Sequence, residues 1–314
     1  MLPSAFAAGV QGSFGGTGPA SAQMITGRAS ADKPASFIAR TAAALLACAL
    51  LTACAAREPV RPIVIQGAMD VEIRKLAGAI QNATEERVSG WTFWRGTIDG
   101  YPVVISKTLK GMENAAAATA IAAERYHPIA IINQGTAGGH VADVHVYDIV
   151  VGTHAVNLGS FKTGYRAGGR GSDMAEWNPL DLMRSEGSAG QDPNARTMRR
   201  FAADEGLLAA ARHARGLYKR GRVVEGVIGS SEVWNSEIDR IQRFHDLYGT
   251  TAEEMEAASS AQIAGLFQIP FLGIRVVSNN IVNGEAYDTR TGEACQDYVY
   301  DVVKAYVEGK AKSR

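Results

Sequence analysis

The chain has 314 residues, of which 46% are hydrophobic and 20% are charged, the composition of an ordinary globular protein. Lys and Arg together number 32, and so do Asp and Glu, so no excess of charge favours nucleic acid or an anionic membrane surface as a partner. The length allows one large α/β domain or two small ones, and we expect no binding to nucleic acid.

The N-terminal part differs in composition from the rest. Gly, Ala and Ser dominate to about residue 36, and Arg40 then precedes the apolar run TAAALLACALLTAC, which ends at Cys54. A positive flank, a short apolar run and small residues before a cleavage point are typical of a secretory signal, and this run is too short to span a membrane. We expect residues 1–54 to be a leader and residues 55–61 a tether.

The sequence LTAC at 51–54 resembles a bacterial lipobox, in which the Cys is lipidated and becomes the first residue of the mature protein. LLAC at 45–48 fits the same pattern but leaves a shorter apolar run after the basic flank, and a plain apolar anchor with incidental cysteines is a further alternative. The lipobox interpretation predicts a periplasmic protein, attached to the membrane only through a lipid on Cys54. Cys295 is then the one remaining thiol, so we expect no intrachain disulfide.

Beyond the tether, strand-like apolar runs alternate with helical periodicity. A hairpin is predicted to join WTFWRGTI to YPVVISK across Asp99-Gly100, a dipeptide typical of tight two-residue turns. Strands alternating with helices, with one early hairpin, predict a mixed α/β sheet in a single domain. Strands are predicted at 62–66, 129–133, 146–154, 223–229 and 271–277, and helices near 69–80, 111–126, 199–219, 235–248, 256–267 and 293–309.

Residues 157–197 are rich in glycine and show little periodicity, so we expect a long functional or flexible loop. Two of its basic residues, Arg166 and Arg170, could reach a bound anion. Arginines in a polar, glycine-rich loop are, however, more often simply solvated.

Four segments occur in the same order as in a known family: GAMDVEI (67–73), INQGTAGG (132–139), GSSEVWNSE (229–237) and EEMEAASSAQIA (253–264). They resemble segments of methylthioadenosine/S-adenosylhomocysteine nucleosidases and related nucleoside phosphorylases, and the last looks like that family's VEMEA segment. The resemblance implies a nucleoside-phosphorylase-like domain over residues 62–314, with a mixed sheet partly closed as a barrel and flanked by helices. It also implies a small-molecule nucleoside as ligand and a homodimer or larger homo-oligomer.

Glu72 matches the family's carboxylate that holds and deprotonates the attacking water. It lies at the start of a predicted helix that follows a strand, where α/β sheets open onto a crevice. The alternative is a solvated Glu at a helix start, favoured by the helix dipole. Asp70 is the neighbouring carboxylate that we expect to be solvated.

Glu256 matches the family's carboxylate that accepts hydrogen bonds from the ribose hydroxyls, and Met255 matches the residue that packs against the sugar. Charge-assisted hydrogen bonds are roughly twice as strong as neutral ones, so one ionised Glu would orient a diol well. The alternative is a surface Glu at a helix N-terminus. Glu253 and Glu254 are expected to supply surface charge.

The TAGG segment at 136–139 follows an apolar strand and is expected to form a tight turn whose backbone approaches the ligand, with Thr136, Ala137 and Gly138 as substrate-binding residues. Phosphorylases of this superfamily carry a phosphate-binding Arg just before the equivalent Gly, whereas this chain has Asn133-Gln134 there. The resemblance therefore favours water over phosphate as the nucleophile.

Val233 and Trp234 match the positions where the family presents a backbone segment and an aromatic residue to the purine. Trp234 either stacks on the base or is a buried core residue. His140 and His145 share no helix face, and no His or Cys cluster has metal-ligand spacing, so we expect neither a metal nor another cofactor.

Ser278-Asn279 departs from the Ser-Asp of the nucleosidases, in which the Asp gives a proton to purine N7 and the Ser steadies it. Asn cannot donate a proton outright, although its amide can hydrogen-bond to N7 or to a 6-oxo group, and losing a general acid typically lowers a rate by about 10²- to 10⁴-fold. Three outcomes stay open: a base that leaves with less help or carries a 6-oxo group, a proton from Glu285 or Asp288, or binding without turnover.

The predicted function is hydrolysis of the N-glycosidic bond of a purine nucleoside or 5′-thio-nucleoside to free base and sugar, with Glu72 and Asn279 at the reacting atoms. A non-catalytic periplasmic nucleoside-binding lipoprotein is one alternative. A nucleoside phosphorylase with a relocated anion site is the other.

Overall fold

The computed structural model describes residues 59–165, 168, 170–180, 182–183, 197–198 and 200–312. They belong to one compact unit, Pro59–Arg314. The expected leader with Cys54, and residues 55–58 of the expected tether, lie outside the described residues. No helix in the described part is long and apolar enough to cross a membrane.

Ten of the described strands form one mixed sheet, in the order β11-β6-β12-β13-β5-β1-β4-β3-β2, with β14 pairing to both β5 and β6. The strands are β1 (Ile63–Gly67), β2 (Gln81–Val88), β3 (Trp91–Ile98), β4 (Tyr101–Lys107), β5 (Ala130–Gly139), β6 (Ile149–Asn157), β11 (Phe201–Ala202), β12 (Val223–Ser230), β13 (Thr250–Glu254) and β14 (Phe271–Asn279). The fold class predicted from the sequence is confirmed.

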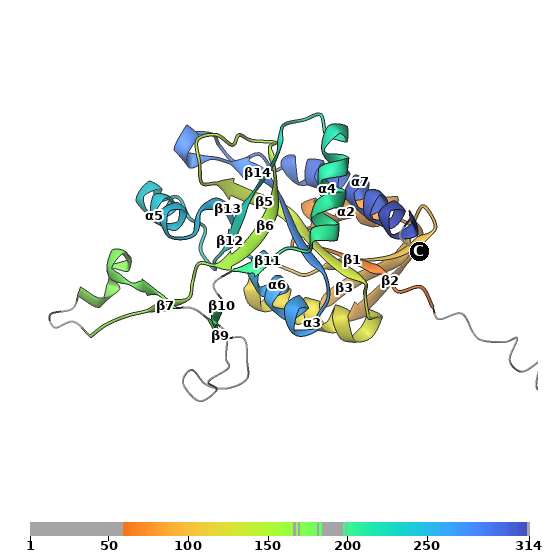
Figure 1. The fold of residues 1–314 in the computed structure, drawn as a ribbon, viewed down its shortest axis with the longest axis horizontal. Helices are drawn as coiled ribbons and strands as arrows, with labels where there is room; N and C mark the ends of the chain where they lie inside the picture. The colour runs from red at the N-terminus through yellow and green to blue at the C-terminus, as the bar shows by residue number, and fades with distance from the viewer. Residues whose placement is uncertain are drawn as a thin grey trace, which may run out of the picture. The chain divides into compact units, whose positions relative to one another are not determined.

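Five of these strands close into a ring. β14 runs parallel to β5 and antiparallel to β6, and the sheet order leads from β6 through β12 and β13 back to β5. This ring is the partial barrel that the family resemblance implies. Strands β1, β4, β3 and β2 continue the sheet outward from β5 (Figure 1).

Helices cover both faces of the sheet (Figure 1). On one face lie α2 (Asp70–Ala79), α4 (Glu205–Ala214) and α7 (Thr291–Lys312), and on the other lie α3 (Met112–Tyr126) and α6 (Ala257–Leu266). A further helix, α5 (Ile238–Tyr248), packs Phe244 and Tyr248 against the ends of β6 and β12. Short 3₁₀ helices η3 (Arg215–Leu217) and η4 (Ile281–Asn283) follow α4 and β14.

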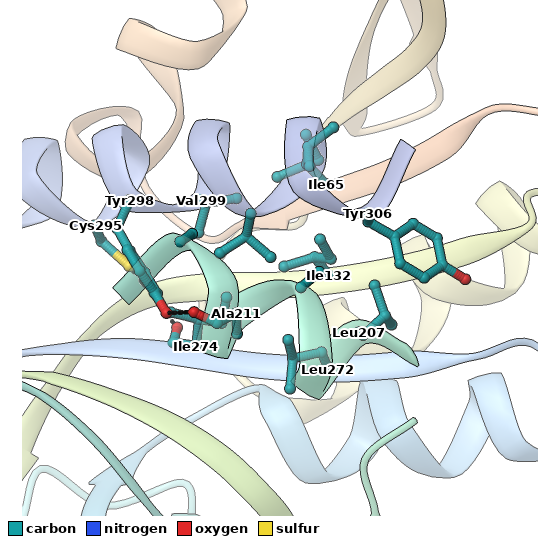
Figure 2. Packing of buried hydrophobic residues seen from close by; sticks show 14 of the residues in the cluster. Ile65, Ile132, Leu207, Ala211, Leu272, Ile274, Cys295, Tyr298, Val299 and Tyr306 are labelled. Carbon is teal, nitrogen blue, oxygen red and sulfur yellow. Dashed lines mark hydrogen bonds between the residues drawn. The ribbon is translucent and has the colours of Figure 1, made fainter. Parts of the chain in front are cut away.

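The first helical layer forms the larger apolar core. Figure 2 shows Ile132 and Leu272 of the sheet packed against Leu207 of α4 and Val299 of α7. The one polar atom of Tyr298 in this layer is satisfied, because its hydroxyl donates to the carbonyl of Ala211 at 2.7 Å. A buried hydroxyl without a partner would cost free energy, so this contact belongs to the packing.

The second layer is built from small side chains. Ala118 and Ala122 of α3 and Ala261 and Ala264 of α6 are all almost fully buried, which lets the two helices approach closely.

The predicted hairpin is confirmed. β3 and β4 pair antiparallel up to Ile98 and Tyr101, and the two turn residues, Asp99 and Gly100, have φ of 49° and 78°. Both positive values are those that a primed two-residue turn requires.

Three strands of the main sheet were not predicted, and one of them, β11, lies within the helix predicted near 199–219. β2 is a mostly exposed strand with the polar sequence QNATEERV, and β13 is a short TTAEE strand. The expected turn at 136–139 is also wrong: these residues belong to β5, which continues to Gly139, because β14 and β13 pair with that strand end from its two sides.

The expected loop 157–197 contains secondary structure where it is described. β7 (Phe161–Lys162) pairs with β8 (Asn178–Pro179), β9 (Leu182–Met183) pairs with β10 (Thr197–Met198), and η1 (Arg170–Ser172) and η2 (Met174–Glu176) lie between β7 and β8. The following helix begins later than predicted, at Glu205, where Asp204 caps it by accepting a hydrogen bond from the Leu207 amide at 2.9 Å.

Candidate active site

A cavity of about 440 Å³ lies where β1, β5, β13 and β14 end. Strand ends of this kind are where α/β sheets bind ligands. The predicted site residues of the folded unit all line this one cavity: Glu72, Thr136, Ala137, Gly138, Val233, Trp234, Met255, Glu256, Ser278 and Asn279. Residues as distant in the sequence as Glu72 and Asn279 are therefore brought together.

Glu72 is a buried carboxylate held by four hydrogen-bond donors. It is the third residue of α2, and its Oε2 accepts from the backbone amides of Ala68 at 3.0 Å and Met69 at 3.1 Å, the back-bonding of a capping box. Its Oε1 accepts from the backbone amide and the hydroxyl of Thr136, at 2.8 and 2.9 Å. The carboxylate is thus fixed between the start of a helix and the end of β5.

Gln134 and Gly135, which precede Thr136, both lie against Glu72. Gln134 donates from its side-chain amide to the Glu72 carbonyl. A Cβ added at Gly135 would lie 2.7 Å from Glu72 Oε1, which is closer than non-bonded atoms tolerate. A glycine at this position therefore lets the carboxylate reach the cavity.

Glu256 is another buried carboxylate that lines the cavity. It is 8% exposed, and its Oε1 accepts from the Gly111 amide at 2.9 Å. Burial raises the pKa of Glu256 to about 8, and the neighbouring charges of Glu254 and Glu72 add to the rise, against the opposing effect of Arg275. A ligand that donates hydrogen bonds to Glu256 would stabilise its ionised form.

The expectation that Glu254 supplies surface charge is wrong. Glu254 is buried and forms an ion pair with Arg275, whose side chain is 1% exposed. Its carboxylate also accepts from the backbone amides of Glu256 at 3.0 Å and Ala257 at 2.9 Å, at the N-terminus of α6. Glu254 thus caps the helix that carries the cavity wall.

Asn133 and Gln134 occupy the place where phosphorylases were expected to carry an Arg. Asn133 accepts from Arg275 through its carbonyl, at 2.9 Å, and through its side chain. Arg275 is therefore bound by Asn133 and Glu254, and it does not line the cavity. Lys110 is the one Lys or Arg among the described residues that line the cavity. Arg166, and the side chain of Arg170, lie outside the described part of the chain.

Asn279 follows a register shift at the end of β14. Its Oδ1 lies 3.2 Å from Ser278 Oγ, which also lies 3.1 Å from the Ala137 carbonyl. The Asn279 side chain lines the cavity, and its Nδ2 amide group donates to no protein group within the described residues. Such an amide group offers hydrogen-bond donors to a ligand.

Neither alternative proton donor lines the cavity. Glu285 contacts the His145 ring at 2.8 Å and accepts from the Val146 amide. Asp288 is held by Arg290, which lowers the pKa of its carboxyl. The expectation that one of them replaces the missing acid is therefore not supported by their positions.

Trp234 is not a core residue. It is 67% exposed at the cavity, where its ring packs edge-on against Tyr287 with centroids 5.4 Å apart. Val233 beside it is 45% exposed. Burial and then the charge of Glu72 raise the pKa of Tyr287, so its hydroxyl stays protonated.

The cavity residues that were not singled out as site residues from the sequence include His140, Asn235, Glu253 and Tyr287. Glu253 was assigned to the surface, although it is 7% exposed. The only local signal for it was its place in the EEMEA segment. No group of His, Cys, Asp and Glu side chains in the described part has the arrangement of a metal site.

Comparison with known proteins agrees with this geometry. Residues 62–308 match a family model described as the phosphorylase superfamily. The chain is 34% identical over 221 residues to the 5′-methylthioadenosine/S-adenosylhomocysteine nucleosidase of Anoxybacillus flavithermus, covering 69% of this chain and 84% of that protein. It is 32% identical over 225 residues to that of Bacillus thuringiensis, covering 69% and 85%.

Solved structures show the same fold. A nucleosidase of this type from Colwellia psychrerythraea, in complex with adenine, superimposes with a TM-score of 0.63 at 26% identity, covering 79% of this chain and 96% of that one. A futalosine hydrolase of Helicobacter pylori superimposes with a TM-score of 0.63 at 20% identity, covering 78% and 98%. The second likeness concerns the fold alone.

Proposed function

Because the chain belongs to the methylthioadenosine/S-adenosylhomocysteine nucleosidase family within the phosphorylase superfamily, we propose that it hydrolyses the N-glycosidic bond of a purine nucleoside or 5′-thio-nucleoside to free base and sugar. Its relatives are N-glycosyl hydrolases. The observation that carries the proposal is that Glu72 and Glu256 face the same cavity.

Water is the proposed nucleophile. Glu72 accepts a proton from the water as its oxygen bonds to C1′ and the bond from C1′ to the base nitrogen breaks. Both oxygens of Glu72 are occupied by donors, but the Thr136 hydroxyl is a rotor and can turn away to admit the water. The two backbone donors on Oε2 meanwhile keep the carboxylate in place.

Glu256 is proposed to bind the ribose diol and to favour the cationic character that the sugar gains as the bond breaks. Met255 lies beside it on the cavity wall and is proposed to pack on the ribose. The base departs with the bonding electron pair, and Asn279 is proposed to stabilise this anion through a hydrogen bond at its N7 edge, with Ser278 orienting the amide. The released base then takes a proton from solvent water.

Lys110 is the one Lys or Arg among the described residues that line the cavity, and this scarcity of cations supports hydrolysis over phosphorolysis. Incubating the protein with methylthioadenosine, adenosine, inosine and guanosine, with and without phosphate, and separating the products by chromatography tests this. Free base released at the same rate without phosphate is the expected result. Strict dependence on phosphate supports the phosphorylase alternative, and binding without any free base supports a nucleoside-binding protein.

We also propose that Cys54 is lipidated and anchors the protein on the periplasmic side of a membrane, as the LTAC pattern suggests. Mass spectrometry of the protein from membranes is expected to find Cys54 as a modified N-terminus. An unmodified Cys54 within a longer chain would reject the anchor. A homodimer or larger homo-oligomer is proposed from the family alone, and light scattering of the purified protein tests it.

A further inference from the structure

Glu253 lines the cavity but has no part in the proposed bond cleavage. Its Oε1 accepts from Ser231 Oγ at 2.6 Å, and its Oε2 contacts His140 Nε2 at 2.9 Å and Asn235 Nδ2 at 2.8 Å. Burial acts to raise the pKa of Glu253, but the hydrogen bond and charge of His140, with the bonds from Ser231 and Asn235, outweigh it and lower the pKa. Glu253 is therefore an ionised acceptor.

This carboxylate has room for one more donor. An ionised carboxylate offers about four acceptor positions, and Oε2 has two donors whereas Oε1 has one. The second position on Oε1 is filled by no donor among the described residues. A buried anion with an unused acceptor position is best satisfied by a ligand N–H.

Glu253 and Asn279 lie on the two sides of one residue. Gly138 of β5 pairs with Glu253 of β13 and with Asn279 of β14. Directly paired residues point to the same face of a sheet, and adjacent strands are about 4.8 Å apart, so the two backbones stand about 10 Å apart. A Cβ on Gly138 would lie 3.5 Å from Asn279 Nδ2, so the Asn279 side chain lies against Gly138, and both Glu253 and Asn279 line the cavity.

The two groups therefore present a fixed pattern to a flat ligand: an amide donor on one side and an anionic acceptor on the other. In hypoxanthine and guanine, O6 and N7 accept hydrogen bonds and N1–H donates one. In adenine the 6-amino group donates and N1 accepts. Adenine would thus place a lone pair against the carboxylate and an N–H against the amide.

We propose that the cavity selects 6-oxopurines, with Asn279 donating to the N7 and O6 edge and Glu253 accepting N1–H. Glu253 and Asn279 are then the residues that determine the base. This inference rests on the proposed function, because it takes the cavity to hold a purine. It narrows the substrate to nucleosides of hypoxanthine or guanine.

Calorimetric titration of the full protein with hypoxanthine, guanine and adenine tests this without requiring turnover. Hypoxanthine is expected to bind at least about tenfold more tightly than adenine, since a hydrogen bond to a charged group contributes a factor of about 10 to 100. Glu253→Gln is expected to lose most of that preference. Glu232→Gln removes another cavity carboxylate, one that accepts from the Met112 amide, and should keep the preference.

Adenine binding as tightly as hypoxanthine overturns the selection of 6-oxopurines and leaves the nucleosidase proposal intact. Failure to bind any of the three bases, together with no cleavage of the four nucleosides, overturns both. If Glu253→Gln does not fold, Asn279→Asp serves as the second variant, because its carboxylate can accept from a 6-amino group. Its preference should move toward adenine by about tenfold, and an unchanged preference in a folded Asn279→Asp protein contradicts the proposal.

Discussion

The buried pair of Glu254 and Arg275 allows a prediction about stability. Glu254→Gln keeps the size of the side chain, and an amide oxygen can still cap the start of α6. The substitution removes the negative charge that neutralises Arg275. Removing one partner of a buried ion pair typically costs about 3–5 kcal/mol. Arg275 Nη2 lies 4.0 Å from Glu256 Oε2, which offsets part of the lost neutralisation, so we expect the free energy of unfolding to fall by about 3 kcal/mol.

The assay is urea denaturation followed by circular dichroism, with Glu225→Gln as the matched control. Glu225 pairs with Arg212 through two contacts of 2.8 Å, but the Arg212 side chain is 48% exposed. An exposed pair contributes about 1 kcal/mol or less, so this control should change stability little. A loss of less than about 1 kcal/mol in Glu254→Gln would show that the buried pair is no stronger than a surface pair, and would refute the argument.

Three further predictions concern the site. Glu72→Gln should lower the rate of base release by about 10²- to 10⁴-fold while binding of the free base, measured by calorimetry, stays unchanged; equal loss of both would make Glu72 a binding residue. The pKa of Glu256, raised to about 8, means that the protonated form prevails below that pH. The ionised form that grips a diol therefore becomes available as pH rises, so nucleoside affinity should increase up to about tenfold per pH unit between pH 6 and 8. Glu256→Gln should abolish this slope, and a wild-type affinity independent of pH over that range would contradict the assignment. Gly135→Ala should displace the Glu72 carboxylate, which the new Cβ would approach to 2.7 Å, and lower the rate of base release at least tenfold with a native circular dichroism spectrum; a fully active variant would show that the carboxylate need not sit there.

Local patterns were enough to predict most of the fold. Apolar β-branched runs predicted β1 and β14, and Asp99-Gly100 predicted a hairpin whose turn has the required backbone. β13 escaped prediction because its sequence, TTAEE, reads as polar. Its two carboxylates are buried only because partners from other segments neutralise or hydrogen-bond to them.

The site was predictable to the extent that it follows a motif. Glu72 and Glu256 could be named from short segments, whereas the role of Glu253 could not. Its contact with His140 joins residues 113 positions apart, and no periodicity connects them. The charge state of a buried group depends on such contacts, so its environment had to come from the folded chain.

The closed ring of strands fixes the positions of β13 and β14, which carry Glu253 and Asn279, relative to each other. Gly138 pairs with β13 and with β14, and both strands belong to the closed ring of five strands. Sliding β13 relative to β14 would therefore require breaking backbone hydrogen bonds around the ring. The β2–β4 meander lies outside that ring. Chain cuts or insertions at its exposed Asp99–Gly100 turn should leave the ligand-binding geometry unaltered. This turn is therefore a suitable point for attaching a reporter.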